Sequence, residues 1–174
     1  FDLPYHTPLE TFFAKHIQGE LDGIAVPDDH APRGMTIDIR GANGGIWSIE
    51  SRGGALHTVS GESETAVLRV ISDEEEFREF SFGVVRDAIR SHPSGERALQ
   101  AMLSSAPGAI SRMREDQIQS LLNQVEGTIQ LNIEAEEEDL TCAFRLQFGP
   151  NEETPKTTVS IELRDYTAML TGEM

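Results

Sequence analysis

The sequence contains two sets of short segments in which apolar and polar residues alternate, and a long helical stretch separates them. Alternation with a period of two is typical of β-strands that bury one face. The combination predicts an α+β fold, with a largely antiparallel twisted sheet and helices packed on one of its faces. The expected strands lie at 35–39, 46–50 and 66–71 in the first set, and at 129–133, 140–148 and 159–163 in the second.

Turn and cap residues indicate where these elements begin and end. Asn43-Gly44 is a strong hairpin signal between the first two strands, and short loops predict that the first three strands form an antiparallel meander. Thr7 and Ser72 each stand three residues before a glutamate, which is the pattern of a capping box at a helix start. The second box opens a predicted helix over 73–89, and two further helical stretches follow it.

The two strand sets also match each other in sequence. TIDI at 36–39 matches TIQL at 128–131, and TAVLRVISD at 65–73 matches TTVSIELRD at 157–165. Both matches have a shift of 92 residues (128 − 36 and 157 − 65). The equal shifts favour an internal duplication, although two amphipathic strand sets also look alike without one.

Net charge restricts the partners of the chain. Lysine and arginine total 14 against 30 aspartate and glutamate, a formal net charge of −16. Such a chain repels phosphate backbones, so we expect no nucleic acid partner and no binding to anionic membranes. No apolar run approaches the ~20 residues of a membrane span, so we expect no stable membrane insertion.

Cysteine usage and the chain start bear on location. Cys142 is the single cysteine, so an internal disulfide is excluded and a reducing compartment is favoured. No signal peptide is visible, and we therefore expect a cytoplasmic protein. The first residue is Phe1 rather than methionine, which suggests a trimmed or partial chain.

Side chains that carry chemistry do not form a recognisable site in the sequence. Asp28, Asp29 and His30 are the nearest approach to a metal cluster, and loop acids of this kind are usually solvated. The acidic runs at 73–76 and 134–139 lack the central glycine of a calcium loop. Nucleophile elbows, phosphate-binding loops and zinc motifs are not found. We therefore expect no catalytic residues, no metal, no cofactor and no enzyme activity.

The order helix, hairpin, strand and acidic helix start resembles the sterol carrier protein type 2 family of lipid-binding domains. The stretches that carry the resemblance are GGIWSIE at 44–50, AVLRVISDEEEF at 66–77, AFRLQFG at 143–149 and TVSIELRDYTAMLTGE at 158–173. The family continues beyond the last of these into an apolar helix and a closing strand, and the second set has no residues left for them. We therefore expect either a first sterol-carrier-like unit with a helical extension at 1–126 and a second, incomplete unit at 127–174, or one enlarged domain over 1–174.

The resemblance implies non-catalytic binding or transfer of a hydrophobic, lipid-like ligand in a cavity between sheet and helices. Such pockets are concave and mostly apolar. The alternative is a protein-interaction or dimerisation module without a small-molecule ligand, because an unfinished sheet leaves an edge to cover. That alternative implies a homodimer or a fused partner domain. The residues expected to bind the ligand are Trp47, Phe77, Phe80, Val84, Phe144, Leu146 and Met169.

Overall fold

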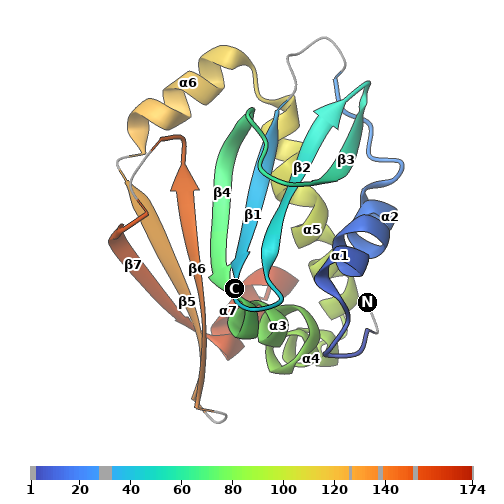
Figure 1. Cartoon of the computed structure of the whole chain (residues 1–174). Helices are drawn as coiled ribbons and strands as arrows, with labels where there is room; N and C mark the ends of the chain where they lie inside the picture. The colour runs from blue at the N-terminus through green and yellow to red at the C-terminus, as the bar shows by residue number, and fades with distance from the viewer. Residues whose placement is uncertain (1–2, 28–32, 126, 137–138, 151–152, 174) are drawn as a thin grey trace.

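A computed structural model of the chain contains one open sheet of seven strands in the order β3-β2-β1-β4-β6-β5-β7, with helices behind it (Figure 1). The structure describes residues 3–27, 33–125, 127–136, 139–150 and 153–173, without the side chains of 101–106 and 111–112. The prediction of an α+β fold is confirmed. The strands are β1 (Gly34–Arg40), β2 (Gly45–Arg52), β3 (Ala55–Ser60), β4 (Ala66–Asp73), β5 (Thr128–Ala135), β6 (Leu140–Phe148) and β7 (Pro155–Glu162).

Helical segments precede, separate and follow the strands. The opening segment changes geometry along its length, because a π-helix lies between two short α-helices. The segments are α1 (Leu9–Thr11), η1 (Phe12–Ile17), α2 (Gln18–Leu21), α3 (Glu74–Phe82), α4 (Val84–Ser91), α5 (Gly95–Arg112), α6 (Glu115–Gln124) and α7 (Leu163–Thr171).

The sheet is mixed, and the predicted meander of the first three strands is wrong. β1 does pair antiparallel with β2 across the Asn43-Gly44 turn, as predicted. The strand predicted at 66–71, however, pairs parallel with β1 on the side away from β2. β3, which the sequence analysis missed, follows a turn at Gly53-Gly54 and takes the outer edge of β2 instead. β5 and β7 are also parallel, and the remaining neighbours are antiparallel.

Two units of the same topology lie side by side in this sheet. The first unit is β1, β2, β3, β4 and α3, and the second unit is β5, β6, β7 and α7. β3 has no counterpart in the second unit. In each unit the first strand is central, the second pairs with it antiparallel, and a third strand, β4 or β7, pairs with it parallel and leads directly into a helix. Both parallel pairs carry a bulge at their first residues, where Gly34 corresponds to Thr128 and Ala66 corresponds to Pro155.

The positions of these bulges show that a constant shift of 92 residues does not align the two units. The first strands are 94 residues apart (128 − 34) and the third strands are 89 apart (155 − 66). A strand with alternating apolar and polar residues shows the same pattern after a shift of two residues. The pattern of β1 therefore does not determine how β1 aligns with β5. β4 has apolar residues on both faces, so its pattern does not determine an alignment either.

Both predicted capping boxes are absent. Helix α1 begins after Pro8, and the Thr7 hydroxyl donates to the carbonyl of Pro4 instead. Helix α3 begins after Asp73, and the Ser72 hydroxyl donates to the carbonyl of Ala143 on β6. The predicted helix at 73–89 is interrupted at Gly83, so α3 and α4 are separate helices.

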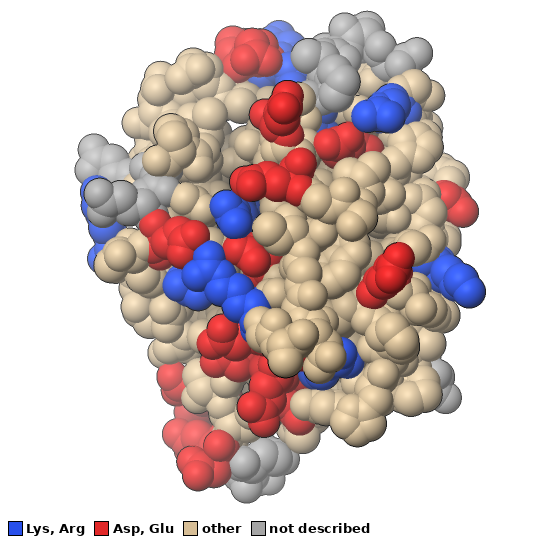
Figure 2. Space-filling view, viewed as in Figure 1, with Lys and Arg blue, Asp and Glu red and all other residues tan. Residues whose placement is uncertain are grey.

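The sheet face away from the helices carries a network of opposite charges. Figure 2 shows acidic and basic side chains interspersed over this face. Asp38 on β1 accepts from Arg69 on β4 at 2.8 Å and from Arg40 at 3.2 Å, and Arg40 also bonds Glu153 at 2.7 Å. Arg40 lowers the pKa of the Glu153 carboxyl through its hydrogen bond. On this face the charged groups surround the buried Val67 and Ile71 of β4, whereas the side that faces the helices is more uniformly apolar.

Aromatic rings join the opening helical segment to the first unit. The Phe13 ring stacks on Trp47 of β2, with ring centroids 4.6 Å apart, and lies 6.0 Å from Phe77 of α3. All three side chains are buried. This cluster fixes the N-terminal segment against the sheet.

Replacing Trp47 with alanine should lower the free energy of unfolding by ~3–5 kcal/mol, because truncating a buried aromatic ring leaves a cavity. Urea denaturation of the variant measures the loss. Met169→Ala is a matched control, since Met169 is 48% exposed and its truncation should have little effect. Equal midpoints for the two variants would show that Trp47 does not pack as described.

Candidate functional site

Six neighbouring apolar residues on the helix-facing side of the sheet are only partly covered, as are Ile37, Leu140 and Ile161 elsewhere on that face. We call the six neighbouring residues the apolar patch: Val70, Ile129, Leu131, Leu146, Phe148 and Val159. The strand registers place them on one face, because Val70 and Ile129 both lie opposite Leu146, and Leu131 lies opposite both Phe144 and Val159. That face is the helix side, because the Phe144 ring packs against Phe80 of α3.

The helices cover the other half of this face more fully. Ile133 and Cys142 continue the same strands and are fully buried, whereas Val159 is 47% exposed. Helices α3 and α7 pack on β6, β5 and β7, and both lie at the lower end of the sheet in Figure 1. The patch therefore lies beyond the region where these helices pack.

Comparison of the two units shows how the first covers the same positions. Met35 and Ile49 of the first unit correspond to Ile129 and Leu146 of the second. Met35 is 8% exposed and Ile49 is 4% exposed, because α5 packs on β1 and β2. Ile129 and Leu146 remain partly exposed. At these two positions the second unit thus leaves apolar surface accessible where the first unit buries it, whereas Ile37 and its counterpart Leu131 are partly exposed in both units.

The seven residues expected to bind a ligand fall into separate groups. Phe80 and Phe144 meet at the border of the patch, with ring centroids 4.9 Å apart, and Leu146 belongs to the patch itself. Trp47 and Phe77 lie in the aromatic cluster around Phe13 and are not brought to these three.

The other two residues lie on helices. Val84 is half-buried at the start of α4, and Met169 is exposed on α7. Five patch residues were not among those expected to bind a ligand. The alternation of apolar and polar residues in β5 and β6 predicts which face of the sheet the residues of these strands occupy. It does not predict which half of that face the helices leave exposed.

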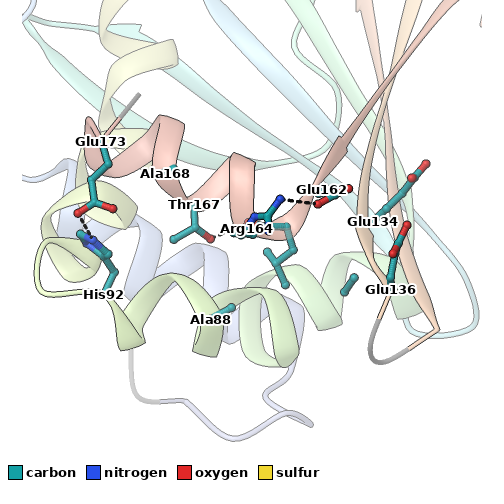
Figure 3. Close-up of a pocket in the computed structure, with 11 residues that line it drawn as sticks. Ala88, His92, Glu134, Glu136, Glu162, Arg164, Thr167, Ala168 and Glu173 are labelled. Carbon is teal, nitrogen blue, oxygen red and sulfur yellow. Dashed lines mark hydrogen bonds and ion pairs between the residues drawn. The ribbon is translucent and has the colours of Figure 1, made fainter.

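A separate pocket of about 580 Å³, lined by both charged and apolar residues, lies between α4, α7 and the ends of β5 and β7 (Figure 3). Its charged groups largely pair with one another. His92 Nε2 lies 2.8 Å from a Glu173 oxygen, and Arg164 lies 3.1 Å from Glu162. Glu134 at the end of β5 also lines it. Its acidic side chains suit a cationic group, and apolar residues such as Leu163 and Ala168 make up the rest of its lining.

Neither a metal-binding cluster nor a membrane-spanning helix is present among the described residues. Within 3–27, 33–125, 127–136, 139–150 and 153–173, no group of three or more His, Cys, Asp and Glu could hold a metal ion. Asp28, Asp29 and His30 lie outside the described residues. In the same part of the chain, no helix combines the length and apolarity needed to cross a membrane.

Comparison of the chain with protein-family models, with curated proteins and with solved structures finds no match. Its architecture is that of an α+β protein whose open sheet holds two similar units in series. The apolar patch and the edges of the sheet are therefore the features from which a function can be inferred.

Cys142 should be unreactive in the folded protein. It is fully buried, and burial raises the pKa of its thiol to about 12, with the charges of Glu76 and Glu79 acting in the same direction. Thiolate is the reactive form, so alkylation at about pH 8 should be negligible in buffer and rapid in denaturing urea. Mass spectrometry of iodoacetamide-treated samples measures this. Complete labelling without denaturant would contradict the burial.

Proposed function

We propose that the chain binds a hydrophobic, lipid-like ligand on the apolar patch without catalysing a reaction. The observation that carries this proposal is the partial exposure of six apolar side chains on the face of the sheet that normally forms a core. Burying apolar surface yields ~25 cal/mol per Å² before the costs of association are subtracted. The resemblance to sterol carrier proteins supports a fatty-acyl or sterol ligand. A cytoplasmic location is part of the same proposal.

The surroundings of the patch support an apolar rather than a charged ligand. Leu121 and Leu122 of α6 pack against the core cluster as partly buried residues, and Leu122 lies close to Gly149 at the end of β6. Arg69 of β4 bonds Asp38 and Glu62 on the opposite face of the sheet, so its charge is not directed at the patch. Desolvation, rather than ion pairing, would therefore supply the affinity.

A protein-interaction or dimerisation module is the second candidate. The outer side of β7 favours it, because β7 is the last strand in the sheet order. β7 shares only Val159 with the apolar patch, so the two candidates are tested with variants at other positions.

Ile129→Thr and Leu131→Thr should weaken binding of a fluorescent fatty-acyl or sterol probe by about tenfold each. Threonine removes apolar contact area and adds a hydroxyl, while it keeps a residue suited to a strand. Probe titration measures the affinity, and urea denaturation measures the accompanying loss of stability, which should be small at partly exposed positions.

Met35→Thr is the matched control, because Met35 occupies the equivalent buried position under α5. It should destabilise the fold without altering probe affinity in the folded protein. A parent chain that binds neither probe would refute the ligand proposal.

A further inference from the structure

Strand β7 has an outer edge that its counterpart in the first unit does not have. In the first unit the corresponding strand, β4, pairs with β1 on one side and with antiparallel β6 on the other. Among the described residues β7 pairs only with β5, on its inner side, and it ends the sheet opposite to β3 (Figure 1). The outer edge of β4 is thus paired with an antiparallel strand, whereas the equivalent edge of β7 has no neighbouring strand among the described residues.

We propose that this edge binds a second copy of the chain, with the two β7 strands antiparallel about a two-fold axis centred on Val159. The resulting dimer would have one continuous sheet, and its interface is isologous. The inference does not rest on the ligand proposal, because it uses the strand edge rather than the patch as a whole.

The charges of β7 favour this register. Lys156 lies near the start of the strand and Glu162 at its end, with no other charged residue between them. Pairing centred on Val159 places Lys156 opposite the partner's Glu162, and the symmetry creates this opposite-charge pair twice. The chain carries a net charge of −16, so a strand edge with no net charge is a favourable place for two copies to meet.

Exposure of apolar side chains points to the same edge. The large apolar side chains that are exposed among the described residues are Val159, 47% exposed, and Met169, 48% exposed. Val159 lies at the centre of β7, and Met169 lies on α7, which follows β7 directly. Antiparallel pairing would set Val159 against the partner's Val159 and would bring the two apolar patches next to each other.

Features that normally protect an edge do not prevent this pairing. Proline and lysine on an edge strand usually discourage added strands. Pro155, which has no backbone N–H, lies opposite the partner's Leu163, where α7 begins and the strand has ended. Glu162 bonds Arg164 at 3.1 Å, and because a carboxylate accepts several hydrogen bonds it can also receive the partner's Lys156.

Charge reversal tests the register. Lys156→Glu creates two like-charge pairs across the axis, and so does Glu162→Lys. Each variant should weaken the dimer ~10–100-fold, as measured by sedimentation equilibrium. A one-to-one mixture of the two variants should restore association, because the heterodimer regains two opposite-charge pairs. The doubly substituted chain should also form a dimer.

Lys15→Glu is the matched control, since Lys15 is the other lysine of the chain, is exposed and lies on η1. It should leave the parent's association unchanged. A parent chain that remains monomeric at about 1 mM would overturn the proposal. Unchanged association of Lys156→Glu, or no heterodimer in the mixture, would also overturn it.

Melting curves and lipid-probe titrations on the same variants separate this test from folding and from the ligand proposal. Lys156 and Glu162 are exposed, so both single variants should melt like the parent chain. Monomeric Lys156→Glu that still binds the probe would show that the two activities are independent. A parent chain that forms the dimer but binds no probe would remove the ligand proposal alone.

Discussion

The antiparallel pairing of β4 with β6 is the contact on which the rest of the structure depends. Leu68 lies opposite Phe148 and Val70 lies opposite Leu146, and these pairs join the two units into one sheet. The units repeat in the same direction along the sheet, so their apolar faces fall on the same side. A single layer of helices can therefore cover both. Without this pairing, each unit would expose one further apolar strand at an edge, β4 in the first unit and β6 in the second.

Much of the secondary structure could be predicted from periodicity, but the order of the strands could not. Residues 140–148 alternate without interruption, and the predicted strand coincides with β6. β4 illustrates the limit, because it is apolar on both faces and is compatible with several partners. β3 was missed because His57 and Thr58 interrupt its apolar pattern. Strand pairing is a long-range property that a local pattern does not encode.

The apolar character of the candidate site could be predicted from the sequence. Which apolar residues form it, and where the helices leave them exposed, could not. Trp47 and Phe144 occupy equivalent positions in the two units, opposite Ile37 and Leu131 respectively. An aromatic ring packs on each of these two residues, but the rings come from different elements. Phe13 of η1 packs on Trp47, and Phe80 of α3 packs on Phe144. The sequence shows which residues are apolar. Whether these residues are buried depends on where the helices pack on the sheet, and only the folded structure contains that information.

The distance along the chain between β4 and β6 has a consequence for biosynthesis. Leu68 and Phe148 are 80 residues apart (148 − 68), and at ~5–20 residues per second a ribosome needs roughly 4–16 s to make that stretch. During this interval the β1–β2 hairpin can form, because its contacts are local. β4, in contrast, has emerged long before its second neighbour exists. The rate of translation, as well as the equilibrium, therefore determines how long the nascent protein is vulnerable to mispairing.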